Sequence, residues 1–272
     1  MHALSSAVEA LMRDVAETIV LPRYRSLAAH EIEEKSPGDL VTVADRESEL
    51  ALNEGLARIL PDARMVGEEG CAANPALMEG LDKGIAWIID PIDGTGNFAA
   101  GRPHFAIMVA LVSEGETQAG WIYDPLRRRM CHAFSGGGAW IDAAQVYARS
   151  SGADQPIAAI ATRFMEPGER EAMIAKLAGE MTLTDIPNCA GEQYPRLVLG
   201  ENDVALFKRT LPWDHAAGAL FVAEAGGKVA RLDGSPYRIW DGQTGLLGAG
   251  SAAIWDAAAR ILGDEGSSRH TP

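Results

Sequence analysis

A continuous apolar run over residues 85–89 leads directly into Asp90-Pro91-Ile92-Asp93-Gly94, and this feature constrains the fold more than any other. An apolar run without polar alternation is typical of a strand that is covered on both faces. Pro91 cannot donate a hydrogen bond to a neighbouring strand, so we expect the strand to end there. Asp93-Gly94 then predicts a turn, which would bring the carboxylates of Asp90 and Asp93 into one small volume.

Two carboxylates this close indicate a bound cation. Like charges in one small volume cannot both stay ionised cheaply unless a cation lies between them. Oxygen ligands without a Cys or His partner favour Mg²⁺ over zinc or copper. Gly94-Thr95-Gly96 also offers backbone N–H groups at a tight turn, where a phosphate could bind. The alternative is a structural turn in which Asp93 accepts a hydrogen bond from its own backbone, and the proline-flanked pair favours the metal site.

Two further acidic segments are ambiguous when each is taken alone. Glu68 and Glu69 follow a short predicted strand, but adjacent glutamates in a turn are commonly just solvated. Asp214 opens a helix predicted over residues 214–225, and aspartate is a preferred residue at a helix N-terminus without any further function. We expect the neighbouring His215 to pack or to form a local hydrogen bond.

The order of predicted elements suggests two halves that differ in how helices and strands follow one another. Helices are expected over residues 8–19, ending before Pro22, and over residues 42–60, and the strands that follow predict an antiparallel meander. After a boundary at residues 150–152, strands and helices alternate, which is typical of an α/β layer arrangement. We therefore expect an N-terminal α+β subdomain over residues 1–150 and a C-terminal α/β subdomain over residues 151–272, with a polar, mobile tail from residue 263. The expected meander strands cover residues 85–89, 105–112, 120–123, 130–134 and 139–141, with Arg127, Arg128 and Arg129 at an exposed hairpin tip; the later elements cover residues 157–161, 167–180, 181–186, 204–207, 214–225, 228–232 and 252–262.

Composition narrows the class of partner. The chain of 272 residues carries 24 basic and 38 acidic side chains, a net charge of −14. Such a surface repels phosphate backbones and anionic lipid, so neither nucleic acid nor membrane is an expected partner. Cys71, Cys131 and Cys189 are widely spaced without a CxxC pair, which predicts a reducing compartment and no zinc cluster. No apolar run reaches the ~18 residues of a membrane span, and we expect a cytoplasmic protein.

Taken together, the segments resemble the inositol monophosphatase family of Mg²⁺-dependent, lithium-sensitive phosphatases. The family's GEE, DPIDGT-x-NF and WD-x-AAG signatures occur in this order around Glu68, Asp90 and Asp214. Residues 35–45, 120–125, 136–140 and 224–227 agree with the family as well, so the resemblance covers roughly residues 35–232. Three ordered motifs of this length do not arise together by accident.

The resemblance implies a fold, an activity and a set of site residues. The implied fold is a layered α-β-α-β-α sandwich, usually a homodimer, and the implied activity is hydrolysis of a phosphomonoester by metal-activated water with two to three Mg²⁺ ions. The implied roles are as follows: Glu68, Asp90 and the carbonyl of Ile92 hold the first metal; Asp90, Asp93 and Asp214 hold the second; Glu68 holds a third through waters; Thr95, Glu68 and Asp45 orient the attacking water; Gly94 and Thr95, beside Asp93, bind the phosphate.

The substrate pocket departs from the pattern of inositol-selective members. Residues 189–194 replace a run of small residues, and Phe207 stands where those members carry an acidic residue that contacts the inositol ring. These changes suggest another alcohol, with Glu192, Gln193, Tyr194, Phe207, Lys208 and Arg209 as candidate pocket residues. Lys208 and Arg209 would favour a second anionic group on the substrate, or they form a solvated turn.

Three alternatives to inositol phosphate stay open within the superfamily: 3′-phosphoadenosine 5′-phosphate, histidinol phosphate and fructose 1,6-bisphosphate. A different class is also open, because some proteins with this fold act mainly as binding partners, for instance on RNA polymerase complexes. The presence of every implied metal ligand in this sequence favours catalysis.

Overall fold

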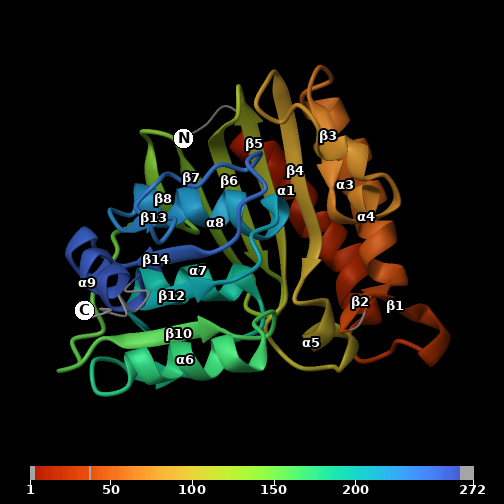
Figure 1. The fold of residues 1–272 in the computed structure, drawn as a ribbon. Coiled ribbons are helices and arrows are strands. Elements are labelled where there is room, and N and C mark those ends of the chain that lie inside the picture. Colours follow the sequence, from red (N-terminus) through yellow and green to blue (C-terminus); the bar gives the residue numbers. More distant parts are fainter. Residues whose placement is uncertain (1–3, 37, 264–272) are drawn as a thin grey trace.

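Five alternating layers of helices and sheets make up the protein (Figure 1). The computed structural model describes residues 4–36 and 38–263, so nearly all of the predicted mobile tail lies outside the described residues. A seven-stranded and a five-stranded sheet are separated by two helices, and further helices cover the outer face of each sheet. The layered α-β-α-β-α sandwich expected from the family resemblance is confirmed.

The larger sheet is the predicted meander with one additional strand at each edge, β3 and β9. β3 pairs with β4 in parallel, and every later neighbour in the sheet is antiparallel. The strands follow one another in chain order: β3 Arg64–Gly67, β4 Ile85–Asp93, β5 Ala106–Ser113, β6 Glu116–Asp124, β7 Arg129–Phe134, β8 Gly138–Ile141 and β9 Ala144–Val146.

The N-terminal helices cover one face of this sheet. α1 (Ser5–Val15) continues through a π-helical turn (Ala16–Val20) into α2 (Leu21–Arg23), so the prediction that this helix ends before Pro22 is wrong. Pro22 lies at the start of α2, directly after the π-helical turn, and the chain stays helical to Arg23. α3 (Val43–Ile59) begins after Thr42, whose side chain accepts a hydrogen bond from the N–H of Ala44. The remaining elements of this half are a hairpin of β1 (Ile32–Ser36) and β2 (Asp39–Thr42), the short helices α4 (Glu68–Ala73) and α5 (Thr95–Ala99), and 3₁₀ turns at Ala29–Glu31 and Pro75–Met78.

The second sheet has the strand order β11-β10-β12-β14-β13 and belongs wholly to the second half of the chain. Its helices divide between its two faces: α7 and α8 lie against the larger sheet, while α6 and α9 pack on the outside. The sequence did not predict α7 or β14. The elements are β10 Ile157–Ala161, α6 Pro167–Leu177, β11 Thr182–Thr184, α7 Ala190–Leu199, β12 Val204–Phe207, α8 Pro212–Glu224, β13 Lys228–Ala230, β14 Leu246–Ala249 and α9 Ala252–Gly263.

β4 is covered on both faces, as its apolar run predicts. Trp87 and Ile89 point into the core with the N-terminal helices, whereas Ile88 belongs to the core between the two sheets. Successive side chains of a strand point to opposite faces, so a strand buried on both sides cannot carry polar residues between its apolar ones. The burial of both faces therefore fixes where the strand delivers the acidic residues that follow it.

The prediction that Pro91 ends this strand is wrong. β4 runs on to Asp93, and its pairing with β5 jumps from Asp90 opposite Met108 to Asp93 opposite Ala106. One extra residue therefore lies on β4 between the two pairs, which is the geometry of a β-bulge. A bulge leaves a residue outside the ladder, so the missing N–H of Pro91 costs no pairing, and the local kink re-aims both carboxylates.

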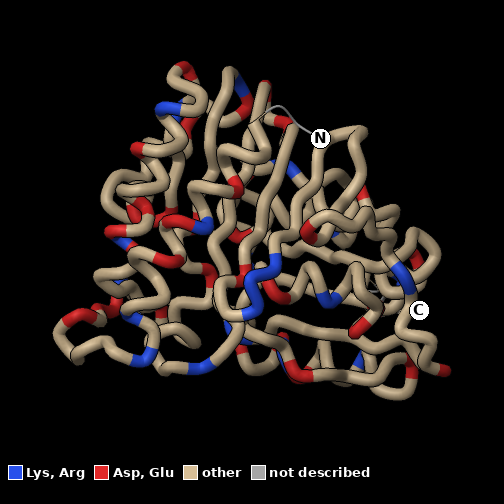
Figure 2. Tube along the Cα trace, turned by 180° about the vertical axis from the view of Figure 1, so that it is seen from behind, with Lys and Arg blue, Asp and Glu red and all other residues tan. Residues whose placement is uncertain are grey.

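Charge is spread over the molecule in the same mixed way as along the sequence. Figure 2 shows acidic residues along much of the trace with basic residues interspersed, in line with the net charge of −14. Within the described part of the chain, no helix combines the length and the apolar character that a bilayer crossing requires.

The contact between α8 and the larger sheet leads to a stability prediction. A Cβ on Gly120 of β6 would lie 2.7 Å from the Cα of Ala217 in α8, and a backbone atom cannot move aside as a flexible side chain can. We expect Gly120→Ala to lower the free energy of unfolding by about 1–3 kcal/mol, because overpacking forces two elements apart. The matched control is Gly168→Ala, which adds the same methyl group in open space near the start of α6. Thermal unfolding of the two variants checks this, and equal melting temperatures would contradict the packing described here.

Candidate metal and phosphate site

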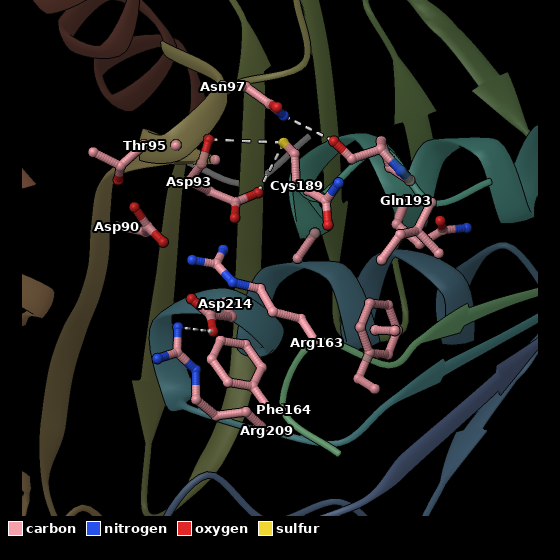
Figure 3. A pocket seen from close by; sticks show the side chains of 18 of the residues that line it. Asp90, Asp93, Thr95, Asn97, Arg163, Phe164, Cys189, Gln193, Arg209 and Asp214 are labelled. Atoms are coloured by element: carbon pink, nitrogen blue, oxygen red, sulfur yellow. Dashed lines mark hydrogen bonds and ion pairs between the residues drawn. The ribbon is translucent and has the colours of Figure 1, made fainter. Parts of the chain in front are cut away.

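Three carboxylates from two elements meet at one end of the larger sheet. Asp90 and Asp93 flank the bulge of β4, and Asp214 lies in the first turn of α8. One oxygen from each side chain can be chosen so that all three lie within 4.8 Å of one another. Figure 3 shows the three side chains pointing toward the same space. The helix begins at Pro212 rather than at Asp214, so the interpretation of Asp214 as the capping residue is wrong.

Burial and mutual repulsion raise the pKa values of all three groups. Burial is the largest cause in each case, and the charge of Glu68 adds to it. The pKa of Asp90, which is 1% exposed, is raised well above its ordinary value, that of Asp93 is raised to about 6, and that of Asp214 to about 8. The cluster therefore holds protons at neutral pH unless cations replace them.

Hydrogen bonds from the backbone orient two of these carboxylates. Oδ1 of Asp90 accepts a hydrogen bond from the N–H of Ile92 at 3.1 Å. Oδ2 of Asp93 accepts from the N–H of Gly191 at 2.6 Å and from the thiol of Cys189 at 3.0 Å. Both donors to Asp93 come from the start of α7, so a helix of the second half holds a carboxylate of the first.

Glu68 lies at the wall of the same site and is paired with a lysine. Its Oε1 accepts a hydrogen bond from Nζ of Lys35 at 2.7 Å, and Lys35 also contacts Glu69 at 2.9 Å. The Glu68 side chain is 12% exposed and lines the cavity together with Asp90. Its carboxylate is outside the close group of three but near enough to raise their pKa values.

A hydrogen-bonded pair of Thr95, which is partly buried, and Asp45, which is buried, adjoins the cluster. Asp45 is 0% exposed, and its Oδ1 accepts a hydrogen bond from Oγ1 of Thr95 at 3.1 Å. Oγ1 of Thr95 also lies 2.9 Å from the carbonyl oxygen of Ile92. Burial raises the pKa of Asp45 to about 6, although hydrogen bonds from the backbone and hydroxyl of Thr42 oppose the shift.

The turn after β4 requires a glycine and leads directly into the N-terminus of a helix. Gly94 adopts φ +84°, and a Cβ there would lie 2.7 Å from the carbonyl oxygen of His104. Thr95 begins α5, and the first N–H groups of a helix have no carbonyl of their own helix to bind. The N–H groups of residues 94–96 are therefore available beside the acidic cluster.

A cavity of about 480 Å³ opens in front of the cluster. Its walls come from both halves of the chain, so residues on either side of the predicted boundary at residues 150–152 contribute to one site. Predicted residues that line it are Glu68, Asp90, Ile92, Asp93, Gly94, Thr95, Gln193, Phe207, Lys208, Arg209 and Asp214; Arg102, Arg163 and Phe164 also line it and were not predicted.

Glu192 is placed elsewhere and has a different environment from the one expected. It does not belong to the cavity lining, and its carboxylate binds Arg129 at 2.5 Å, Arg196 at 3.0 Å and Arg127 at 3.3 Å. Burial raises the pKa of Glu192, but the arginines outweigh that effect and lower it. The prediction of an exposed arginine tip is therefore wrong for Arg129, which is partly buried, whereas Arg127 and Arg128 are exposed.

The other predicted pocket residues form a partly apolar wall. Phe207 stacks on the buried ring of Tyr194 with centroids 5.1 Å apart, and Tyr194 itself does not line the cavity. The hydroxyl of Tyr194 donates to Nδ1 of His215 at 2.7 Å, and Nε2 of His215 donates to the carbonyl of Arg209 at 2.9 Å. Burial lowers the pKa of His215 to about 3, so this histidine is neutral and has the local role that was expected.

Comparison with known proteins identifies the family. A sequence profile described as the inositol monophosphatase family matches residues 2–264, and the chain belongs to that family. The inositol-1-monophosphatase of Bacillus subtilis is 31% identical over 241 residues, covering 87% of this chain and 88% of the relative. The Nus factor SuhB of Escherichia coli is 29% identical over 267 residues, covering 96% of each chain.

Solved structures show the same fold at lower identity. The extragenic suppressor protein suhB of Bartonella henselae gives a TM-score of 0.83 at 23% identity, covering 97% of this chain and 100% of that one. An IMPase of Thermotoga maritima gives 0.81 at 24% identity, covering 97% and 98%. A structure described as an IMPase/NADP phosphatase complexed with Mg²⁺ and phosphate gives 0.81 at 22% identity, covering 97% and 96%.

The raised pKa values predict how the metal-free protein responds to pH. Each carboxyl group of the cluster binds its proton more tightly when folded than when unfolded, so stability falls as pH rises from about 4 toward 8. We expect Asp214→Asn to flatten this loss and to raise the melting temperature in EDTA at pH 8 by a few degrees. Asp62→Asn, at an exposed aspartate, is the matched control. If the melting temperatures of the wild type and Asp214→Asn change with pH in parallel, ionisation of the cluster does not destabilise the metal-free protein.

Proposed function

We propose that this chain is a Mg²⁺-dependent phosphomonoester hydrolase that releases inorganic phosphate from a small phosphorylated alcohol. The observation that carries the proposal is the convergence of Asp90, Asp93 and Asp214 within 4.8 Å at a cavity bordered by the N-terminus of α5. Membership of the inositol monophosphatase family supports phosphatase chemistry and leaves the substrate open.

The donor set fits magnesium. The available atoms are carboxylate and carbonyl oxygens, which are the ligands that Mg²⁺ prefers, and the raised pKa values show that burial and repulsion outweigh the nearby charge of Arg209. A structural neighbour described as complexed with Mg²⁺ and phosphate supports the same choice. Two to three ions would be held in this way: Glu68, Asp90 and the carbonyl of Ile92 for one, Asp90, Asp93 and Asp214 for a second, and Glu68 for a third.

The chain's own residues would orient the phosphate and the water. The N–H groups of Gly94 and Thr95 can donate to phosphate oxygens beside Asp93, as helix N-termini do for anions. Thr95 donates its hydroxyl proton to Asp45, so its oxygen can accept a hydrogen bond from the attacking water, with Glu68 on the other side of that water. Asp45, with a pKa of about 6, can take up the proton that the water loses. When bound, Mg²⁺ would neutralise the phosphate dianion and lower the pKa of water.

The leaving alcohol would occupy the part of the cavity lined by Gln193 and Phe207. Phe207 offers an apolar ring in place of the acidic contact of inositol-selective members, which argues against inositol phosphate as the best substrate. The candidates are inositol phosphate, histidinol phosphate, fructose 1,6-bisphosphate and 3′-phosphoadenosine 5′-phosphate. We extend to this chain the family's homodimeric state and the expectation of a cytoplasmic location.

A mainly non-catalytic binding role is the second candidate. Its support is the similarity to Nus factor SuhB, which covers 96% of this chain. The acidic cluster favours catalysis, because a chain that only binds a partner gains nothing from buried carboxylates that repel one another. A panel of the candidate substrates with and without Mg²⁺ separates the two functions, and no Mg²⁺-dependent phosphate release from any monoester would favour the binding role.

Removal of one ligand should abolish turnover. We expect Asp90→Asn and Asp93→Asn to lower Mg²⁺-dependent kcat by roughly a thousandfold or more, because several kcal/mol of charge stabilisation depends on the bound cations. Both variants should remain folded, since the substitution relieves repulsion. Phosphate release is the measurement, with Asp62→Asn as the control. Near wild-type turnover of either variant at saturating Mg²⁺ would refute the assigned metal site.

Lithium should inhibit where sodium does not. The family resemblance motivates this expectation, and its physical basis is replacement of the more weakly held Mg²⁺ by Li⁺ after hydrolysis. Phosphate release is to be compared in LiCl and NaCl at matched ionic strength. An equal response to the two salts would show that the second metal site of this chain differs from that of its family.

A further inference from the structure

Two of the basic side chains that line the cavity are already neutralised by carboxylates. Nζ of Lys208 lies 2.5 Å from a carboxylate oxygen of Glu169. The guanidinium of Arg209 lies 3.3 Å from Asp39 and 3.9 Å from Asp214. A second negative group on the substrate would have to compete with these carboxylates, so neither residue is the best receptor for it.

Arg163 and Arg102 line the same cavity without such partners. In the part of the chain that the structure describes, neither forms an ion pair with a carboxylate. Arg163 follows β10, on the loop that leads to α6, and Arg102 follows α5. The uncompensated positive charge of the cavity therefore lies on these two residues.

Arg163 is the better positioned of the two. Its guanidinium lies 5.4 Å from the centroid of the Phe164 ring and donates a hydrogen bond to the carbonyl of Gly38. The side chain of Arg102 has no hydrogen bond, ion pair or ring contact within residues 4–36 and 38–263. Figure 3 shows the side chain of Arg163 extending into the cavity. A side chain held in place loses less conformational entropy when it binds a ligand.

The ring of Phe164 also brings two positive charges together. Arg209 lies over the same ring at 4.3 Å, so two guanidinium groups share one aromatic side chain at the cavity mouth. The charge of Arg209 is balanced by Asp39, and that of Arg163 is balanced by no carboxylate of the described chain. An anion bound at Arg163 would complete the charge balance and form charge-assisted hydrogen bonds.

We propose that Arg163 is a second anion subsite, which binds a negatively charged group on the leaving alcohol while the scissile phosphate lies at Asp90, Asp93 and Asp214. The inference rests on the proposed function and narrows its substrate class to phosphomonoesters that carry a further phosphate, carboxylate or sulfate. It moves this role away from Lys208 and Arg209, the residues that the sequence suggested.

The test compares substrates that differ by one phosphate. The probes are glucose 1,6-bisphosphate against glucose 1-phosphate, and adenosine 3′,5′-bisphosphate against adenosine 3′-monophosphate, each with Mg²⁺. We expect the wild type to prefer the bisphosphate of at least one pair by roughly ten- to hundredfold in kcat/KM, as a charge-assisted bond gives. Arg163→Ala should remove most of this preference and leave the monophosphate within about threefold, and Arg163→Lys should keep part of it.

Lys208→Ala is the matched control, because it removes a cation of the same cavity that is already paired. Retention of the preference in Lys208→Ala and its loss in Arg163→Ala would support the subsite. If Arg163→Ala lowers kcat/KM equally for the bisphosphate and the monophosphate of a pair, Arg163 acts on the scissile phosphate. No loss, or a loss only in Lys208→Ala or Arg102→Ala, would place the anion elsewhere. Either of the last two outcomes would overturn the proposal, as would a wild type that shows no preference for a bisphosphate.

Calorimetric titration separates failure of the subsite from failure of the proposed function. If the wild type releases phosphate neither from these probes nor from the wider panel of candidate substrates, the proposed function fails, and binding of the two bisphosphates still reports on Arg163. Binding that is at least ten times weaker in Arg163→Ala than in the wild type would uphold the subsite. Equal binding by the two proteins, or no binding by either, would refute it.

Discussion

Repulsion among buried carboxylates is the interaction on which the rest of this structure depends. Asp90, Asp93 and Asp214 lie close together at the end of a strand that is covered on both faces, and burial raises the pKa of each. Such an arrangement is unfavourable for folding, and it persists because the surrounding elements fix each group. The fold therefore needs the positive charge of a bound cation to relieve this repulsion. The phosphate site lies beside the three carboxylates.

The larger sheet and the helical layer between the two sheets together build this arrangement. The bulge of β4 aims two carboxylates, and the starts of α7 and α8 supply the donors to Asp93 and the side chain of Asp214. Both helices lie between the two sheets, so the site forms only when the halves of the chain pack together. This explains why both the acidic and the basic residues that line the cavity come from both halves of the chain.

The sequence predicted the elements whose signal is local. The apolar run of β4, the meander and the ordered acidic motifs needed no knowledge of the packing, and the family resemblance gave the layers. α7 was missed because Pro195 lies inside it, and an internal proline is ordinarily a signal against a helix. Glu192 was taken for a pocket residue because only the fold shows its three arginine partners. Arg163 carries no motif, and its position at the cavity depends on the loop that follows β10.

The most direct test of the central claim is a count of the protons that Mg²⁺ displaces. Calorimetric titration of Mg²⁺ at pH 7, in buffers of different ionisation enthalpy, measures this number because metal binding expels protons from its ligands. With a pKa of about 8 for Asp214 and a raised pKa for Asp90, we predict release of roughly one proton or more per chain, and less in Asp90→Asn. Mg²⁺ binding with no proton release, or no saturable binding at this cluster, would contradict the account.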